Sequence, residues 1–343
     1  MTLFFIGAGL SPVKDLTLES LDAVDRCEKI YVDTYTGYLD EEVLNFLRRR
    51  KGGQLVLASR KMLEDEGVKI VMEAMERDVG IVVAGDPFIA TTHQALRSEA
   101  FQRKVPVCIV HGISVVSAAA SISGLHIYKF GRIATVPRTG DLKQLSQPYQ
   151  AILDNLALGL HTLLLLDTAD GGLTVQEALK NLRSFERDYT HKIFVDELLI
   201  IAAARMGLRD FRIAAFRLDQ IEHISLPSPP HCMIIPGEMH FTEREFVKTY
   251  STDPHYLDSY TPPNTSRERL TSYAGKCNRI LEYLSAKGVN SRYLEYVRSY
   301  VDDSLNFLMN RDMFNAFLAM GYAEGLLDAL RLRGEVEFSW DGV

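Results

Sequence analysis

Short apolar runs and amphipathic segments alternate along the first third of the chain. The apolar runs are typical of buried strands in a parallel sheet and lie at Leu3–Gly7, Lys29–Val32, Gln54–Leu57, Gly80–Ala84 and Val107–Val110. The segments between them carry apolar residues at helical spacing and predict helices at Thr17–Arg26, Glu41–Arg50, Val68–Arg77 and Ala90–Arg103. This alternation predicts an α/β lobe with a mostly parallel sheet, right-handed crossovers and helices on both faces.

The following stretch keeps α/β character but is less regular. A helix of small residues, 114–121, precedes strands expected at Ile133–Val136, His161–Leu166, Leu198–Ala203, Arg212–Ala215 and Cys232–Ile235. Helices are expected at Tyr149–Leu158, Val175–Phe185 and Glu243–Thr249. Hairpin-like spacing between two of these strands favours antiparallel pairing, so we expect a mixed sheet. The long polar segment 137–148 is a candidate lid, with an ordinary surface loop as the alternative.

The composition changes at Ser251. Proline and polar residues in 251–265 are typical of a linker. Three further segments repeat apolar residues every three or four positions and predict a small all-α helical bundle over 266–334. We therefore expect four parts: an N-terminal α/β lobe at 1–128, a C-terminal α/β lobe at 129–250, the linker, and the bundle. The bundle carries no cluster of catalytic residue types, so we expect the active site in the lobes.

Small and polar residues follow the predicted parallel strands. They lie at Gly7–Gly9, at Asp33–Thr36, at Gly85–Asp86 and at His111–Ser114. Because parallel strands end at the same edge of a sheet, these loops are expected to converge on one small-molecule site. The stretch from Val82 to His93 is expected to form the floor of that site. An ordinary strand-to-helix turn explains this stretch about equally well.

Charge, cysteines and hydropathy exclude several classes of function. A net charge of −7 with interspersed signs gives no indication of nucleic-acid or anionic-membrane binding. The cysteines are widely separated, which favours reduced, buried thiols over disulfides or a metal site; they are Cys27, Cys108, Cys232 and Cys277. Because no apolar stretch is long enough to span a bilayer and no signal peptide is evident, we expect a cytoplasmic protein.

The first loop superficially matches a dinucleotide-binding fingerprint. Gly7 and Gly9 have the required spacing, and Asp33 lies near the position of a ribose-binding acid. However, Pro12 occupies the third glycine position, and the next helix begins only near Thr17, too far away to hold a pyrophosphate. A nicotinamide-dependent oxidoreductase therefore stays an alternative, not the preferred interpretation.

Several sequence blocks together resemble a known family from Met1 to about Lys248. They are Phe5–Leu10, Tyr35–Thr36, Gly85–Pro87 with Ala90–His93, Gly124–Gly131, Gly159–Leu164 with Asp167, and Pro229–His231 with Pro236–Gly237. In this order they resemble the archaeal diphthine synthases, which belong to the tetrapyrrole-methylase-like class of S-adenosylmethionine methyltransferases. The terminal helices are similar to an uncharacterised archaeal helical family that occurs alone and fused to other domains.

The resemblance implies a fold, a reaction and a set of contacts. The expected fold is a two-lobed, non-Rossmann methylase that forms a homodimer and binds S-adenosylmethionine between its lobes. The expected reaction is stepwise methylation of the amino group of a modified histidine, 2-(3-amino-3-carboxypropyl)histidine, of translation elongation factor 2 in diphthamide biosynthesis. The implied cofactor contacts are Leu10, Asp86, Ile89, Ser114, Val115, Leu166, Met206 and His231, with Ala204 as a neighbouring candidate.

The expected chemistry needs no metal and no nucleophile. A sulfonium is already a good methyl donor, so the enzyme mainly aligns donor and acceptor in a water-poor cleft. His93, Asp86 and Asp167 are possible proton acceptors, but turn, capping and packing roles explain each of them better, and no catalytic base is assigned. Tyr35 or Tyr128 is a candidate to face the cation that methylation creates, although a core role is the commoner one.

Two segments differ from the family pattern, and both are expected near the acceptor. Residues 139–149 are shorter and differently composed, and the turn 167–172 lacks several residues. The alternatives to a diphthine synthase are a methyltransferase acting on a tetrapyrrole or corrin precursor, the oxidoreductase above, and a binding protein that uses its terminal helices and has inactive methylase lobes.

Overall fold

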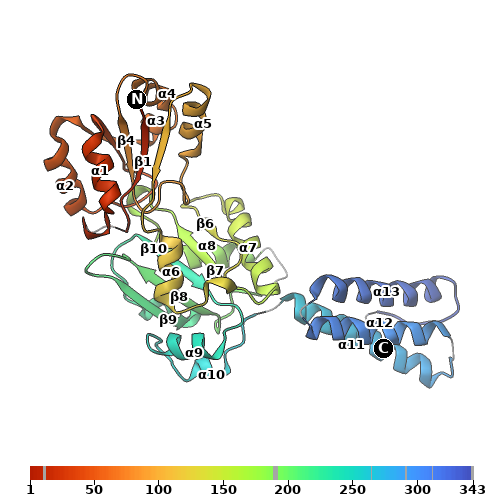
Figure 1. Cartoon of the computed structure of the whole chain (residues 1–343). Coiled ribbons are helices and arrows are strands. Elements are labelled where there is room, and N and C mark those ends of the chain that lie inside the picture. The colour runs from red at the N-terminus through yellow and green to blue at the C-terminus, as the bar shows by residue number, and fades with distance from the viewer. Residues whose placement is uncertain (11–12, 188–191, 264, 290–291, 311, 341–343) are drawn as a thin grey trace.

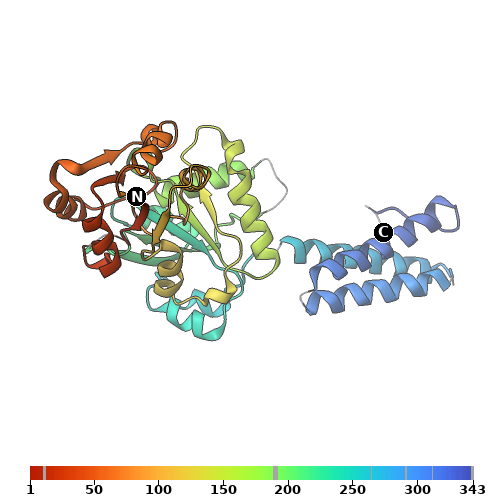
Figure 2. The same cartoon turned by 45° about the horizontal axis from the view of Figure 1, so that its top comes forward.

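The computed structural model describes residues 1–10, 13–187, 192–263, 265–289, 292–310 and 312–340. Two α/β lobes stand one above the other in Figure 1, and a helical bundle reaches out from the second lobe. The turned view in Figure 2 shows the same separation of the bundle from the lobes. The expected two-lobed fold with an all-α appendage is confirmed.

The first lobe is built on a parallel sheet. Its strands pair in the order β3-β2-β4-β1-β5, every pair parallel. Their bounds are β1 Leu3–Gly7, β2 Lys29–Asp33, β3 Leu55–Ala58, β4 Val79–Val83 and β5 Val107–Val110. Each lies within one or two residues of its predicted position, because a strand covered on both faces has a nearly continuous apolar sequence.

Helices cover both faces of this sheet, as predicted. Their bounds are α1 Leu18–Arg26, α2 Glu41–Lys51, α3 Arg60–Leu63, α4 Gly67–Glu73 and α5 Gln94–Gln102. Phe5 packs with α3, α4 and α5 on one face, and its neighbour Ile6 packs with α1 and α2 on the other. Successive residues of a strand point to opposite faces, so one short apolar run serves both cores.

Two helix predictions in this lobe are wrong in their bounds. The helix expected from Ala90 begins only at Gln94. Ala90 has φ of +56°, a left-handed conformation that a right-handed helix excludes. The helix expected over Val68–Arg77 ends at Glu73, and the short helix α3 before it was not predicted.

The second lobe contains the expected mixed sheet. Its strands are ordered β6-β7-β10-β8-β9; β6 and β7 are parallel, and the other pairs are antiparallel. Their bounds are β6 Ala134–Val136, β7 Thr162–Leu166, β8 Leu199–Ala204, β9 Arg212–Arg217 and β10 His231–Ile235. Antiparallel pairing follows from the short connection between β8 and β9, which leaves no room for a crossover helix.

Helices pack on both faces of this sheet too. They are α6 Val115–Ser123, α7 Ser146–Ala157, α8 Val175–Glu186, α9 Phe241–Lys248 and α10 Tyr256–Ser259. The core with α7 and α8 lies on one face, and the core with α6, α9 and α10 lies on the other. Part of the candidate lid belongs to the core that contains α7 and α8, since Leu142–Leu145 forms a short 3-10 helix with Leu145 fully buried in that core.

The C-terminal helices form a bundle with a core of its own. They are α11 Thr265–Ala286, α12 Arg292–Met309 and α13 Met313–Leu332. In the expected linker, 251–265, Leu257 and Tyr260 are buried in the second lobe, and Asn264 lies outside the described residues. Contact between α11 and α7 joins the bundle to the lobe.

The described residues also bear on the thiols and on membranes. All four cysteines are free, as expected; three are buried, and Cys108 is partly exposed. Within the described ranges, no helix has both the length and the apolar character that crossing a bilayer requires.

Candidate functional site

A cavity of about 350 Å³ lies between the two lobes. Its walls come from the loops that follow β1, β2, β3, β4 and β5 in the first lobe and from the ends of β7, β8 and β10 in the second. The convergence expected from the strand ends is therefore confirmed. Its size lies in the range typical of small-molecule sites.

Three glycines let the loops of the first lobe meet at this cavity. Gly9 and Gly85 pair as an isolated antiparallel bridge, and the Gly85 amide donates to the Gly9 carbonyl at 2.7 Å. A Cβ on Gly7 would lie 2.5 Å from the amide nitrogen of Gly112 and 2.8 Å from the Gly85 oxygen. A side chain on Gly7 would force the β1, β4 and β5 loops apart.

Asp86 brings the cavity a buried carboxylate. Its residue is 9% exposed, its Oδ1 accepts from the Phe88 amide at 3.1 Å, and its Oδ2 lies 2.7 Å from Nδ1 of His111. Gly85 reaches this turn with φ of +72°, which a side chain would strain. The turn therefore holds this carboxylate rigidly at the centre of the first sheet's edge.

Asp33 organises the neighbouring loop and does not line the cavity. Its Oδ2 lies 3.1 Å from Nε2 of His93, and its Oδ1 accepts from the amide of Tyr35 at 2.9 Å. Burial alone would raise the pKa of Asp33, but the hydrogen bonds from His93, Thr36 and the Tyr35 amide lower it. This pair fixes the loop after β2 to the start of α5, which gives the Asp33 carboxylate a structural role.

His231 provides the second lobe's polar contact. Its Nδ1 accepts from the Val175 amide at 3.3 Å, and its Nε2 lies 2.7 Å from the carbonyl oxygen of Pro227. Burial lowers the pKa of this imidazole. The ring is thus neutral, with its proton on Nε2, and the residue lines the cavity.

The structure gathers most of the residues that the resemblance implied. Eight of them line the cavity: Leu10, Asp86, Ile89, Ser114, Val115, Leu166, Met206 and His231. Ala204 is fully buried and pairs with His231 in the sheet, while its neighbour Ala203 lines the wall.

The other candidate residues are placed differently. Tyr35 and Asp167 line the cavity, but Tyr128 is 95% exposed outside it and His93 is buried against Asp33. No residue of the candidate lid, 137–148, is in the cavity wall among the described residues. Pro12, on which the argument against a dinucleotide partly rested, lies outside the described residues. The late start of α1 is confirmed, with Thr17 as its cap.

Sequence reasoning missed a polar cluster at one end of the cavity. Arg60 donates to Glu64 at 2.7 Å, the Tyr35 hydroxyl donates to Glu64 at 3.0 Å, and the Tyr35 and Thr92 hydroxyl oxygens lie 2.5 Å apart. All four residues line the cavity. The available signal was the position of Arg60 directly after a parallel strand with an acid four residues later.

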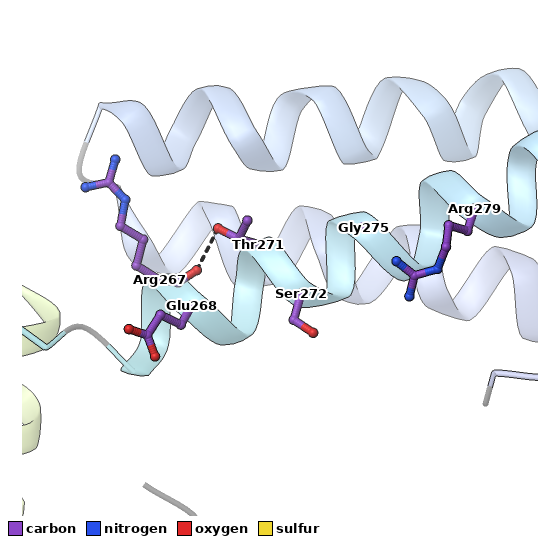
Figure 3. Close-up of a pocket in the computed structure, with 6 residues that line it drawn as sticks. All are labelled: Arg267, Glu268, Thr271, Ser272, Gly275 and Arg279. Atoms are coloured by element: carbon purple, nitrogen blue, oxygen red, sulfur yellow. Dashed lines mark hydrogen bonds between the residues drawn. The ribbon is translucent and has the colours of Figure 1, made fainter. Parts of the chain in front are cut away.

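A second hollow lies in the bundle, along the exposed face of α11 (Figure 3). It is lined only by residues of that helix, from Arg267 to Arg279, and the labelled side chains do not converge on one point. Thr271 Oγ1 donates to the Arg267 carbonyl at 2.9 Å, an ordinary contact within a helix. This surface offers no enclosed site.

A metal centre has no counterpart in the described part of the chain. No group of three His, Cys, Asp or Glu side chains is placed to hold an ion there.

Comparison with known proteins shows which families the chain resembles. The model of the tetrapyrrole (corrin/porphyrin) methylases matches residues 2–222, and that of a family of unknown function, DUF357, matches 277–335. A diphthine synthase of Methanothermobacter thermautotrophicus is 33% identical over 248 residues, which cover 71% of this chain and 94% of that protein.

Two further relatives agree. A probable diphthine methyl ester synthase of Arabidopsis thaliana is 33% identical over 72% of this chain and 98% of its own. A crystal structure of a diphthine synthase superposes with a TM-score of 0.67 at 31% identity, covering 75% of this chain and 99% of that one. The chain belongs to the tetrapyrrole methylase family and, within it, to the diphthine synthases, with a DUF357 domain at its C-terminus.

Proposed function

We propose that this protein is a diphthine synthase that transfers methyl groups from S-adenosylmethionine to the modified histidine of translation elongation factor 2 in diphthamide biosynthesis. The observation that carries the proposal is the match to diphthine synthases over nearly their whole length. A tetrapyrrole or corrin acceptor and a nicotinamide cofactor have no comparable support. The proposed acceptor atom is the amine nitrogen of the 3-amino-3-carboxypropyl group.

The cavity has the chemistry that S-adenosylmethionine requires. Apolar side chains of Leu166, Met206 and Val115 suit the adenine ring, and the Asp86 carboxylate suits a donor of hydrogen bonds or an ammonium group. Backbone around Gly9 and Gly85 lies open to a ligand because neither residue carries a side chain. We propose that these residues and the neutral His231 hold the donor.

The protein's own residues then act by placement. S-adenosylmethionine supplies an activated methyl group on a positively charged sulfur. The lobes align the acceptor nitrogen with that methyl group and exclude water from the contact. The ring of Tyr35, which lines the cavity, is suited to face the ammonium charge that methylation creates. Burial is the larger cause and the nearby Glu64 carboxylate the smaller one that together raise the pKa of the Tyr35 hydroxyl to about 12. The hydroxyl is therefore protonated at neutral pH and can donate a hydrogen bond.

Three further properties belong to the same proposal. We propose a homodimer, a division of the chain at residues 128, 250 and 265, and action in the cytoplasm, where a translation factor is present. Sedimentation of the purified protein measures the first of these, and a mass of one chain would contradict it.

Calorimetry and mass spectrometry test the function together. Calorimetric titration is expected to give binding of S-adenosylmethionine and none of a nicotinamide dinucleotide. Elongation factor 2 that carries the unmethylated precursor is expected to gain methyl groups on the modified histidine. Because the Arabidopsis relative is named for a methyl ester, the product is also treated with alkali: N-methyl groups survive and esters hydrolyse. An unchanged mass of the factor would overturn the proposal.

A further inference from the structure

The order of strands in the first sheet divides the cavity into two ends. Leu10 and Ser114 follow β1 and β5 at one edge, whereas Tyr35 and Arg60 follow β2 and β3 at the other. Neighbouring strands lie about 4.8 Å apart, so β3 and β1, three steps away, are separated by roughly 14 Å. Asp86, after β4, lies between the two ends.

The second lobe repeats this division. Met206 and His231, which we propose as donor contacts, belong to the ends of β8 and β10, and a Cβ on Gly207 would lie 2.7 Å from the Leu10 side chain. Thr168, after β7, donates to the Tyr35 carbonyl at 3.5 Å. On one side of the cavity the loop after β1 thus meets the loop after β8, and on the other side the loop after β2 meets Thr168, which follows β7.

The second end carries paired charges that the donor contacts do not use. Arg60 is the one lysine or arginine among the described residues that line the cavity. Its side chain is 74% exposed, and that of Glu64 is 28% exposed. An exposed ion pair of this kind contributes little to stability, because solvent screens it. Its guanidinium is thus free to exchange its partner for a ligand carboxylate at small cost.

The acceptor has the complementary charges. A 3-amino-3-carboxypropyl group ends in one carboxylate and one amine on the same carbon. We propose that Arg60 binds the carboxylate of this group and that Glu64, with the Tyr35 hydroxyl, binds its amine. The proposal rests on the function proposed above and names the part of the cavity that receives the acceptor. Bidentate contact of a guanidinium with a carboxylate would fix the group's orientation.

This placement also accounts for which atom is methylated. A carboxylate held by Arg60 is neutralised and occupied, which leaves the amine nitrogen of the same group as the nucleophile. Before the acceptor binds, the hydrogen bond from Arg60 lowers the pKa of Glu64, and the hydroxyls of Thr92 and Tyr35 lower it further; these two hydroxyls remain beside Glu64 when Arg60 turns to the ligand. Arg60 and Glu64 are positioning residues in this account.

The test compares Arg60→Met with Arg60→Lys, Glu64→Gln and a control. The control is Arg103→Met, which removes a similar ion pair, Arg103 with Glu99 at the end of α5, outside the cavity. For each variant, KM and kcat are measured with elongation factor 2 carrying the precursor, and the dissociation constant of S-adenosylmethionine is measured by calorimetry.

Arg60→Met is expected to raise KM for the factor about tenfold or more, with the donor's dissociation constant unchanged. Arg60→Lys keeps the positive charge but cannot make the bidentate contact, so its KM should lie between those of Arg60→Met and the wild type. Glu64→Gln should also raise KM. Arg103→Met should have the KM of the wild type. Equal KM values for Arg60→Met and Arg103→Met overturn the proposal, and so does weaker donor binding in Arg60→Met, which would assign the pair to the donor. A wild-type protein that binds the donor and leaves the factor unmethylated overturns the proposed function, and this inference with it.

Discussion

Asp86 is the residue on which donor binding depends most in this account. Its carboxylate is buried at the junction of the two ends of the cavity and is held by the Phe88 amide and His111. Asp86→Asn keeps an oxygen for the Phe88 amide and removes the charge. We expect the dissociation constant of S-adenosylmethionine to rise about tenfold, as for loss of a charge-assisted hydrogen bond.

Calorimetry of the purified variant measures this change. Asp170→Asn is the matched control, because Asp170 is exposed and lies outside the cavity wall. Equal affinities of the two variants and the wild type would show that Asp86 does not contact the donor.

Gly7 tests the close approach of the loops. In Gly7→Ala the new Cβ would lie 2.5 Å from the Gly112 nitrogen, so the backbone must shift. We expect a loss of about 1–3 kcal/mol in the free energy of unfolding, together with weaker donor binding. Urea denaturation measures the first effect. Gly53→Ala is the control, since a Cβ there meets nothing within 4 Å, and equal stabilities of the two variants would refute the packing argument.

Sequence reasoning at this scale succeeded where strand ends mark the edge of a sheet. Gly9, Gly85 and Asp86 follow predicted parallel strands, and all three line the cavity. Arg60 and Glu64 escaped notice because exposed pairs of arginine and glutamate are common on any helix. Tyr128 was misjudged because an aromatic side chain in a connecting segment gives no indication of which way it points.

Among the elements, α9 fixes the segment that connects the lobes. Glu243 on α9 is fully buried and accepts from the His126 amide at 2.7 Å and from Lys129 Nζ at 2.6 Å; its Oε1 lies 3.1 Å from Nε2 of His161. Burial alone would raise the pKa of this carboxyl, but hydrogen bonds from His161, Lys129 and two backbone amides lower it strongly. The connection at 124–131 is thereby tied to the second lobe.

Glu243→Gln is expected to cost about 3 kcal/mol of unfolding free energy at neutral pH, because it removes the buried charge with which Lys129 pairs and to which the surrounding groups donate. The carboxyl binds its proton more readily in the unfolded chain, at its ordinary pKa of 4.5, than in the fold. The wild type therefore loses this stability as the pH falls below 4.5, and the difference from the variant shrinks.

Urea denaturation at several pH values measures both effects. Glu245→Gln on the same helix is the control, since the Glu245 side chain is 65% exposed and pairs only with Lys248 in the described structure. A difference between wild type and Glu243→Gln that stays constant as the pH falls would contradict the linkage.

Element bounds were predictable to the extent that local sequence determines them. The strands of the first sheet are buried on both faces, and their apolar runs mark them directly. The start of α5 was not predictable, because nothing in the sequence shows that Ala90 adopts positive φ. The turn there is imposed by the fold, through Asp33 and His93 from distant segments.

For the whole molecule, the bundle and the lobes have separate cores. The bundle's buried side chains contact one another, and among the described residues the link to the second lobe includes the α11–α7 contact and an ion pair of Arg267 with Glu238 at 4.0 Å. We expect a chain ending after Tyr260 to fold and to bind S-adenosylmethionine with an unchanged dissociation constant. Thermal melting and calorimetry measure this, and a chain that fails to fold or to bind the donor would show that the lobes need the bundle.

The arrangement of two lobes around one cavity was predicted through the resemblance, not from periodicity. Alternation of strands and helices gives each sheet, but nothing in it places Leu10 against Gly207 or Tyr35 against Thr168 across the lobes. Those contacts depend on how the two lobes face each other, which periodicity does not report.

The central claim is that this cavity joins S-adenosylmethionine to the modified histidine of elongation factor 2. Transfer of an isotopically labelled methyl group, followed by mass spectrometry of the factor's peptides, tests it most directly. The account predicts alkali-stable label on the peptide with the precursor side chain and none on a factor whose histidine is unmodified. Label elsewhere in the factor, or no label at all, would contradict it.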